Sequence, residues 1–433
     1  MSIRRLSGVG ILRLSILALT TMIASPALAS PNILLIIADD MGVDVSPCYS
    51  ETPQANMPNL KELCDNGMVF ENAYSAPLCS PTRATVMTGK YGFRTGVGSV
   101  PSREHGGSLS EHETTVFDRI KDKGYSTALI GKWHLSADPR DLNHPQKLGV
   151  DHFFGPFGGG VKDYENWAAV ENGRRVRVSN YATSEISDRA IDWLGSQSSP
   201  WFLWLAYNAP HTPFHLPPTD LHNFDDLSGN DRDLKRNPAP YYYAALEALD
   251  AELGRALDSL SADERHDTVV FFIGDNGTPT QLLGRDNQGR GKGSLYEGGV
   301  NVPLIVSGTS VSAGRSEALV NTTDLFSTIL TLADADPTAE DSISFVPALA
   351  GAAGDRQFAY VEHFAESPPR GGAQLGWAIR DARYKLIKFD DQPAALFDLL
   401  RDPGEQRNLL QISSTKHEEI AASLIEAKSQ ITQ

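Results

Sequence analysis

The chain has 433 residues, of which 41% are hydrophobic and 21% charged, a balance that suits a folded protein and excludes a disordered or collagen-like chain. Its 54 acidic residues against 38 basic ones give a formal charge of −16. Because nucleic-acid-binding proteins usually present a basic surface, we expect no nucleic acid partner. The length predicts two or three domains, or one large α/β domain with an appendage.

The first 29 residues have the pattern of a secretory signal peptide. Arg4, Arg5 and Arg13 supply positive charge, residues 16–24 form a short apolar run, and residues 27–29 (ALA) make a small-x-small cleavage site. The alternative is an N-terminal membrane anchor, but the apolar run is short for a span and contains two threonines. We therefore expect an exported protein, periplasmic or secreted, without stable membrane insertion.

Apolar, β-rich runs follow the signal segment and alternate with helical patterns. The runs are Asn32–Ala38, 127–130, 201–207, 268–273 and 302–306, and the helical patterns between them lie at 115–123, 184–194, 242–260 and 323–333. Short apolar runs of this kind are typical of fully buried strands. The alternation predicts an α/β fold, with a mostly parallel central sheet flanked by helices, over residues 30–354.

The pattern changes near residue 355. Four strand-like runs with few helices between them are followed by one helical segment; the runs are 358–363, 375–380, Tyr384–Phe389 and 395–399, and the helix is 417–428. Residues 355–433 therefore predict a small C-terminal α+β subdomain with an antiparallel sheet.

The three cysteines are too few for a disulfide framework in a chain of this length. Cys64 lies on the apolar face of a short helical pattern at 58–67, so core packing explains it. A Cys48–Cys64 disulfide is the alternative, and the sequence leaves both open.

Charged and polar residues follow the buried strands. Asp39 and Asp40 end the first run, and Asp275 and Asn276 follow the run at 268–273. Ligands of open α/β sheets bind at the carboxyl ends of strands, and buried charges are costly unless they are paired or bind a metal. Either pair alone could serve as a turn or a helix cap. Two pairs of oxygen donors at two strand ends favour a site for Ca²⁺ or Mg²⁺.

Four cationic or proton-transferring side chains lie at further strand ends or in a glycine-rich loop: Lys132, His134, His211 and Lys292. A single such residue is usually only solvated. Together they suit a tetrahedral anion held on a divalent cation, as in phosphoryl or sulfuryl transfer.

Cys79 lies in the segment CSPTR (residues 79–83), where Pro81 indicates the start of a helix. A helix N-terminus lowers the pKa of a thiol, so the position predicts a nucleophile. A buried structural cysteine is the alternative.

The segment from Cys79 to Arg83, followed by four residues and Thr88-Gly89, resembles the signature of type I sulfatases, which belong to the alkaline-phosphatase-like superfamily. The resemblance also covers 32–40, 131–135, 210–213, 275–277 and 291–303, and in the tail 384–386, 396–399 and 402–405. It implies an alkaline-phosphatase-like catalytic domain and an arylsulfatase-type sulfuric ester hydrolase.

The resemblance also implies roles for individual residues. Cys79 would be oxidised by a formylglycine-generating or sulfatase-maturating enzyme to Cα-formylglycine (3-oxoalanine), whose hydrate attacks the sulfur of the ester. Ca²⁺, with Mg²⁺ the less expected ion, would be bound by Asp39, Asp40, Cys79 after its modification, Asp275 and Asn276. Arg83 would hold the hydrate, and the sulfate would be bound by Lys132, His211 and Lys292. His134 would remove a proton from the hydrate, and His211 or Lys292 would protonate the leaving alcohol.

An exported sulfatase meets polysaccharides, so a sulfated carbohydrate is the expected substrate and an aryl sulfate its surrogate. Two alternatives stay open: a phosphodiester or phosphonate hydrolase of the same superfamily, and a catalytically inactive carbohydrate-binding homologue in which Cys79 stays a thiol. One departure from the family pattern is Asn301, where many relatives carry arginine. The polar loops at 138–162 and 217–240 predict the rim of the substrate site.

Overall fold

The computed structural model describes residues 30–104, 106–198, 200–284, 287, 289–364 and 375–433. The predicted signal peptide lies outside the described residues. Within them, no helix combines the length and the apolar character needed to cross a membrane.

A ten-stranded sheet forms the centre of the molecule, with the strand order β10-β2-β9-β8-β1-β7-β3-β4-β5-β6. The five adjacent strands β8, β1, β7, β3 and β4 run parallel, whereas β9 is antiparallel to both of its neighbours and β5 and β6 form an antiparallel edge. The strands are β1 Asn32–Ala38, β2 Gly67–Tyr74, β3 Ser126–Gly131, β4 His152–Gly155, β5 Trp167–Glu171, β6 Arg174–Val178, β7 Trp201–Ala206, β8 Thr268–Gly274, β9 Leu304–Gly308 and β10 Gly314–Asn321. The carboxyl ends of the central strands therefore meet at one edge of the sheet.

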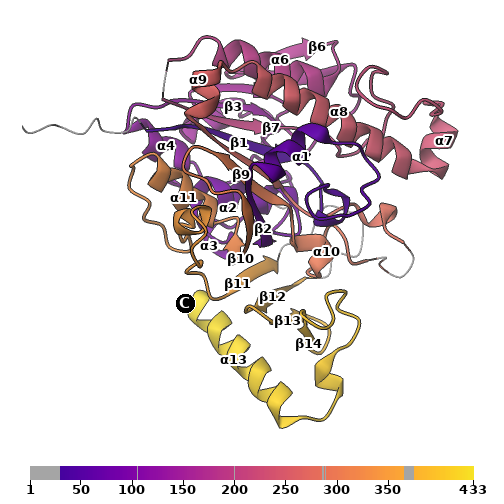
Figure 1. Ribbon diagram of the computed structural model, residues 1–433, viewed down its shortest axis with the longest axis vertical. Helices are drawn as coiled ribbons and strands as arrows, with labels where there is room; N and C mark the ends of the chain where they lie inside the picture. Colours follow the sequence, from indigo (N-terminus) through magenta and orange to yellow (C-terminus); the bar gives the residue numbers. More distant parts are fainter. Residues whose placement is uncertain (1–29, 105, 199, 285–286, 288, 365–374) are drawn as a thin grey trace, which may run out of the picture.

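Helices cover both faces of this sheet (Figure 1). Successive side chains of β1 enter two separate cores: Ile33 and Leu35 pack into one, and Leu34 and Ile36 into the other. The first core includes α2 (Cys79–Thr88), α4 (Val116–Lys121) and α11 (Asp324–Leu332). The second includes α1 (Pro58–Asp65), α6 (Ala182–Leu194) and α8 (Pro238–Asp258). Burial on both faces explains why β1 is apolar throughout, as the sequence predicted.

The C-terminal segment adds a four-stranded antiparallel sheet of β11 (Ala359–His363), β12 (Gly376–Arg380), β13 (Tyr384–Phe389) and β14 (Ala395–Asp398). Helix α13 (Thr415–Ile431) covers one face, where Leu424 packs with Ile379 and Leu386. The other face packs against Leu295 and Val300 of the larger domain. The predicted fold class is confirmed, and the domain boundary at residue 354 stays a prediction.

The sequence did not predict β2, β4, β5, β6 or β10, and its strand at 302–306 is β9, which runs antiparallel. β6 (RRVRV) is largely exposed, so it lacks the apolar run of a central strand. The shorter helical segments are η1 Val43–Val45, α3 Gly92–Thr95, α5 His144–Lys147, α7 Asp231–Arg236, α9 Ala262–His266, η2 Thr280–Leu282, α10 Glu297–Val300, α12 Val346–Leu349 and η4 Leu409–Gln411.

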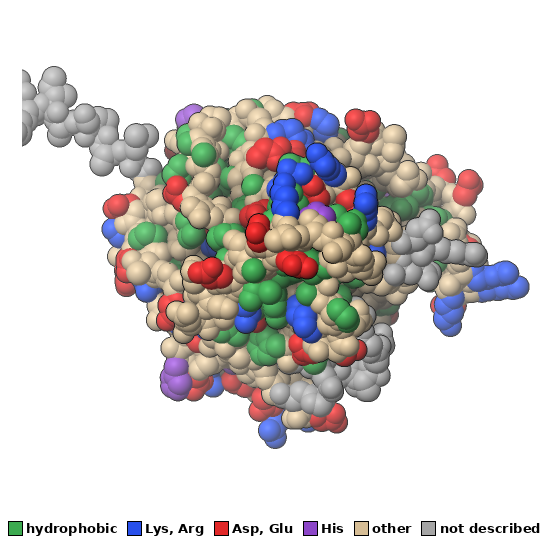
Figure 2. All heavy atoms as spheres, turned by 90° about the horizontal axis from the view of Figure 1, so that it is seen from below, with side chains coloured by type: hydrophobic (Ala, Val, Ile, Leu, Met, Phe, Trp, Pro, Cys, Tyr) green, Lys and Arg blue, Asp and Glu red, His purple; other side chains and the backbone are tan. Residues whose placement is uncertain are grey.

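Both signs of charge are present on the surface. On the face shown in Figure 2, acidic side chains lie among the basic ones.

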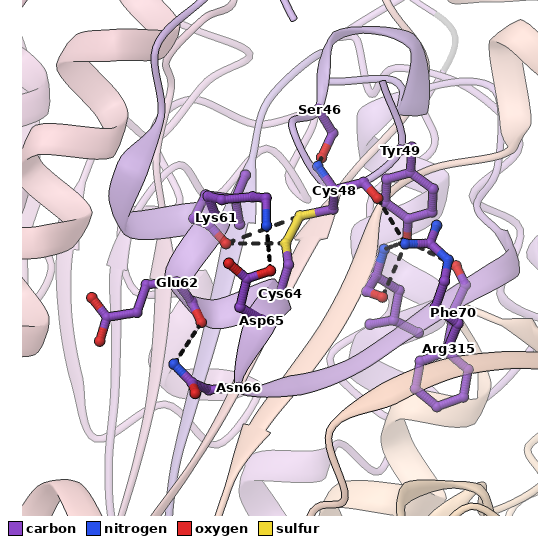
Figure 3. The surroundings of a disulfide bond; sticks show 12 residues. Ser46, Cys48, Tyr49, Lys61, Glu62, Cys64, Asp65, Asn66, Phe70 and Arg315 are labelled. Carbon is purple, nitrogen blue, oxygen red and sulfur yellow. Dashed lines mark hydrogen bonds and ion pairs between the residues drawn. A yellow bond between two sulfur atoms is a disulfide. The ribbon is translucent and has the colours of Figure 1, made fainter. Parts of the chain in front are cut away.

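Cys48 and Cys64 form a disulfide between the segment before α1 and α1 itself, with a Cα–Cα distance of 5.9 Å (Figure 3). Of the two possibilities that the sequence left open for Cys64, the structure therefore shows the disulfide bond. Cys79 is the free cysteine, and it is buried.

Candidate active site

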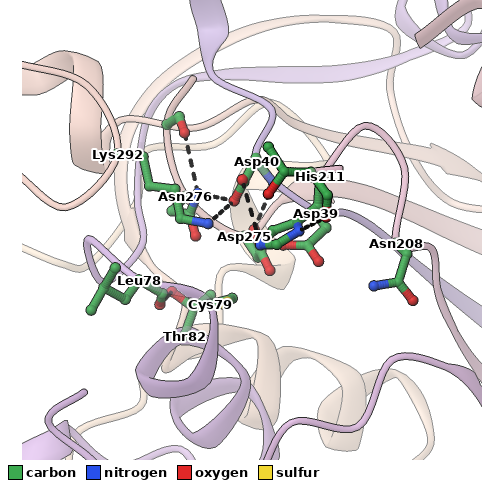
Figure 4. Close-up of polar contacts among 12 residues, drawn as sticks. Asp39, Asp40, Leu78, Cys79, Thr82, Asn208, His211, Asp275, Asn276 and Lys292 are labelled. Atoms are coloured by element: carbon green, nitrogen blue, oxygen red, sulfur yellow. Dashed lines mark hydrogen bonds and ion pairs between the residues drawn. The ribbon is translucent and has the colours of Figure 1, made fainter. Parts of the chain in front are cut away.

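Four strand ends, one helix N-terminus and the glycine-rich loop with Lys292 bring the predicted residues together, and Figure 4 shows the carboxylates with Cys79, His211 and Lys292. β1 ends in Asp39-Asp40, β8 in Asp275-Asn276, β3 in the segment with Lys132 and His134, and β7 in the loop with His211. α2 begins at Cys79. Because β8, β1, β7 and β3 are adjacent and parallel, these side chains gather at one edge of the sheet.

The carboxylates form a cluster that fits a metal ion. Ligand atoms of Asp39, Cys79 and Asp275 lie within 4.8 Å of one another, as do those of Asp39, Asp40 and His211. Oδ1 of Asp39 and Oδ1 of Asn276 are buried without a hydrogen-bond partner among the described residues. Burial and the nearby Asp275 raise the pKa of Asp39 well above its usual value, although Lys132 opposes this effect. A bound cation would satisfy the free oxygens and relieve this repulsion.

Asp40 occupies a tight turn with φ +73°, a left-handed conformation that aspartate tolerates better than most residues. Its N–H donates to Asp275 Oδ1 at 3.0 Å, and its carbonyl accepts from the Tyr242 hydroxyl at 2.8 Å. Asn276 Nδ2 donates to Asp40 Oδ1 at 2.8 Å. Burial opposes ionisation of Asp40, but the charge of Lys292 and its hydrogen bond to this carboxyl act against burial, and the pKa of Asp40 lies below its usual range. The turn is therefore fixed by contacts from α8 and from the end of β8.

Each carboxylate of the cluster has a cationic partner. Lys132 Nζ lies 2.5 Å from Asp39 Oδ2, and Lys292 Nζ lies 2.5 Å from Asp40 Oδ1. Arg83 Nη2 donates to Asp275 Oδ2 at 2.8 Å, and its Nη1 donates to the Lys132 carbonyl at 2.9 Å. These pairs balance three buried negative charges with three positive ones.

His134 lies against the cysteine. Its Nδ1 is 3.4 Å from Cys79 Sγ, and Ser80 Oγ donates to the His134 carbonyl at 2.7 Å. Burial, together with the charges of Lys132 and Arg83, lowers the pKa of His134 well below its usual value. The imidazole is therefore neutral at pH 7 and able to accept a proton.

The expected lowering of the thiol pKa at Cys79 is wrong. Cys79 is the first residue of α2, as predicted, but burial raises the pKa of its thiol, and Asp39 and Asp275 add to the rise. Lys132 and Lys292 act in the opposite direction without cancelling it. The unmodified thiol is therefore protonated at neutral pH and a poor nucleophile.

His211 lies between two cis X-Pro bonds, Ala209–Pro210 and Thr212–Pro213. Its Nδ1–H donates to the Thr212 carbonyl at 2.7 Å, and its Nε2 lies 3.9 Å from Asp40 Oδ2. Burial lowers the pKa of His211 to about 4, although Asp40 partly opposes this shift. Without a bound anion, His211 is neutral at pH 7.

The structure adds residues to which the sequence gave no role. The Tyr242 hydroxyl holds the main chain of Asp40, and the Ser80 hydroxyl holds that of His134. Asn208 lies just after the end of β7, beside the site. Asn208 directly follows a predicted strand, so its position was a usable signal. Asn301 contacts Glu297 Oε2 at 3.3 Å, and no hydrogen bond joins it to the described residues of the site.

Buried carboxylates, paired cations and a cysteine at a helix N-terminus fit an enzyme that binds a metal ion and an anionic ester. The family model named Sulfatase matches residues 31–335, and the chain belongs to this family. It is a sulfatase-type enzyme, as the sequence predicted. A second family model, N-sulphoglucosamine sulphohydrolase, C-terminal, matches residues 291–433 and so crosses the predicted domain boundary.

Curated relatives and solved structures agree with this assignment. N-acetylgalactosamine-6-sulfatase of Canis lupus familiaris is 32% identical over 76% of this chain and 67% of its own length. Human arylsulfatase A is 28% identical over 88% of this chain and 83% of its own length. The crystal structure of Ps i-CgsB covers 93% of this chain and 92% of its own, with a TM-score of 0.77 and 25% identity. The same enzyme has been solved in complex with k-i-k-neocarrahexaose.

Proposed function

We propose that the protein is a Ca²⁺-dependent, formylglycine-type sulfatase that removes sulfate from a sulfated carbohydrate and accepts aryl sulfates as surrogates. The observation that carries this proposal is the position of Cys79, whose Sγ lies within 4.8 Å of ligand atoms of Asp39 and Asp275. Sγ stands where the modified residue would carry its oxygen atoms. Because the pKa of the thiol is raised, an unmodified Cys79 would make a poor nucleophile.

Two groups would complete the site. As a hydrated aldehyde, the modified residue supplies two geminal hydroxyl groups, one to attack sulfur and one whose deprotonation later releases sulfate. Ca²⁺ supplies positive charge where the reacting oxygens gather. Asp39, Asp40, Asp275 and Asn276 would hold it, because they provide hard oxygen donors and two of their buried oxygens have no other described partner.

The chain's own residues then bind the ester and move protons. Lys132, His211 and Lys292 bind the sulfate group, and Arg83 holds the hydrate of residue 79. Neutral His134 accepts a proton through Nδ1, the atom that faces residue 79. A negative charge bound beside His211 would favour its protonated form, so that His211 can protonate the leaving oxygen, with Lys292 as the rival donor.

The substrate class is supported by the relatives. A mammalian relative is named N-acetylgalactosamine-6-sulfatase, and a solved relative was crystallised with k-i-k-neocarrahexaose. The proposal includes export to the periplasm or the medium, which rests on the first 29 residues, and maturation by a formylglycine-generating or sulfatase-maturating enzyme.

Mass spectrometry of the tryptic peptide that contains residue 79 tests the modification. Active enzyme should carry an aldehyde there, and full activity with an alkylatable thiol would refute the mechanism. Cys79→Ala should abolish turnover and leave the melting temperature unchanged.

A side-by-side assay tests the reaction. Nitrophenyl sulfate should be the better substrate, and preference for bis-nitrophenyl phosphate would favour the phosphodiesterase alternative. Failure of both substrates, with sugar binding retained, would favour the binding protein. Metal analysis should find one Ca²⁺ per chain, and fully active metal-free protein would refute the metal site.

A further inference from the structure

The side chain of Asn208 is buried beside the site and has no hydrogen-bond partner among the described residues. It is 1% exposed, and both of its polar atoms, Oδ1 and Nδ2, are without a partner. A buried amide normally satisfies at least one of these atoms, because leaving both unpaired is costly. Figure 4 shows its amide nitrogen on the side that faces the carboxylates.

The position of Asn208 does not depend on its side chain. Its carbonyl accepts from the His211 N–H at 2.8 Å and from the Tyr164 hydroxyl at 3.0 Å. The same Tyr164 hydroxyl lies 2.7 Å from the His211 carbonyl. These two hydrogen bonds hold the main chain of Asn208, so its side-chain amide is available for another partner.

A glycine-rich segment closes the space around this amide. A Cβ added at Gly160 would lie 3.3 Å from His211 Nδ1 and 3.7 Å from Asn208 Nδ2. A Cβ at Gly159 would lie 2.6 Å from His134 Nε2, too close for any real side chain. The segment therefore lies beside the side chains of His134, His211 and Asn208, and the space at Gly159 excludes any larger residue.

We propose that Asn208 is a further substrate-binding residue, and this rests on the proposed sulfatase function. Its Nδ2 donates to a sulfate oxygen of the bound ester, and its Oδ1 accepts from a hydroxyl of the attached sugar. β7 lies between β1 and β3, so Asn208 lies between the strand ends that carry Asp39 and Lys132. An amide suits this place because it can donate to an anion without adding a charge to a cluster of three carboxylates.

Kinetics of Asn208→Ala and Asn208→Asp test the proposal. The substrates are nitrophenyl sulfate and the sulfated monosaccharide that the wild type hydrolyses fastest, and inorganic sulfate serves as the competitive inhibitor. Nitrophenyl sulfate can use only the hydrogen bond from Nδ2 to the sulfate, so Asn208→Ala should lower kcat/KM for this substrate about 10-fold. The sulfated sugar also uses the bond from its hydroxyl to Oδ1, so Asn208→Ala should lower kcat/KM for the sugar about 100-fold. Asn208→Asp, which keeps the shape but loses the donor, should raise the Ki of inorganic sulfate at least about 10-fold.

Asn32→Ala is the matched control. Asn32 is equally buried but lies at the opposite end of β1, where its Oδ1 accepts from the Trp201 N–H at 3.1 Å. The Asn32→Ala variant should have a lower melting temperature, but its Ki for inorganic sulfate and its kcat/KM should stay within about twofold of wild type.

Other outcomes are separable. If both Asn208 variants lose only stability, the amide is structural and the proposal is wrong. Equal losses of Asn208→Ala on the two substrates would overturn the contact to the sugar hydroxyl. A wild type without activity on any sulfate ester would instead refute the proposed function, and this role with it.

Discussion

The ion pairs of Lys385 test how much a buried lysine on β13 stabilises the contact between the C-terminal sheet and the larger domain. Its Nζ lies 2.7 Å from Glu297 Oε1 and 3.0 Å from Glu405 Oε1, and its side chain is 1% exposed. Lys385→Met keeps the length of the side chain but leaves the buried Glu405 and the half-buried Glu297 without this cation. Glu297 keeps the Tyr74 hydroxyl at 2.8 Å, whereas Glu405 has no second ion pair among the described residues.

Removing one partner of a buried ion pair costs about 3–5 kcal/mol. At about 2.1 cal/mol/K of unfolding entropy per residue, a chain of some 400 residues would lose about 4–6 °C of melting temperature. Burial raises the pKa of Glu405 and the charge of Lys385 opposes this rise, so removing the lysine raises the pKa of Glu405 further. A carboxyl whose folded pKa lies above its unfolded value destabilises as pH rises, so the loss should be larger at pH 8 than at pH 5.

Urea unfolding at pH 8 and pH 5 measures this loss. Lys388→Met is the control, because Lys388 lies on the same strand and, among the described residues, donates only to backbone carbonyls; it should cost about 1 kcal/mol or less. Adding Glu405→Gln to Lys385→Met should restore part of the stability at pH 8. A loss below about 1 kcal/mol at pH 8, or one equal at both pH values, would refute the reasoning.

Three further predictions concern pH, the disulfide and proton transfer. Burial lowers the pKa of His215 to about 4, below the usual value of about 6.5 in an unfolded chain, so stability should fall as pH drops through this window. His215→Phe, which can still stack on Tyr164, should remove up to about 2 kcal/mol of the difference in unfolding free energy between pH 7 and pH 5; an unchanged difference would contradict the shift. Cys64→Ser should lower the unfolding free energy by about 3 kcal/mol, because the disulfide joins residues 16 apart, and an unchanged urea midpoint would count against it. His211→Ala should slow hydrolysis of a sugar sulfate by about two to four orders of magnitude and that of nitrophenyl sulfate much less, since nitrophenolate leaves without a proton; equal losses would assign the proton to Lys292.

The strand ends were predictable because each strand and the polar residues that follow it form one short pattern in the sequence. β1, β7 and β8 are buried along their whole length, so an apolar run followed by charged residues marks both the strand and its ligand-bearing end. Once these strands are taken as parallel, Asp39, Asp275 and Lys132 must lie close together. The position of the carboxylate cluster therefore follows from the sequence without the structure.

Other features depend on contacts that leave no local pattern. Glu297 and Lys385 are 88 residues apart, and neither has a neighbour in sequence that indicates the pair. The pKa of Cys79 was predicted in the wrong direction because a helix N-terminus is visible in the sequence, whereas complete burial beside two carboxylates is not. β2 contains Glu71 and Asn72 among its apolar residues, so its sequence lacks the continuous apolar run of a buried strand. The strand forms because it pairs with β9 on one side and β10 on the other.

The pairing of each carboxylate with a cation has a consequence for turnover. Three negative and three positive charges cancel, so a bound Ca²⁺ would leave this pocket with a net charge of about +2 inside a protein of −16. A sulfate ester carries one negative charge, whereas free sulfate carries two. The enzyme should therefore hold its product more tightly than its substrate, so that departure of sulfate limits the rate and salt speeds it.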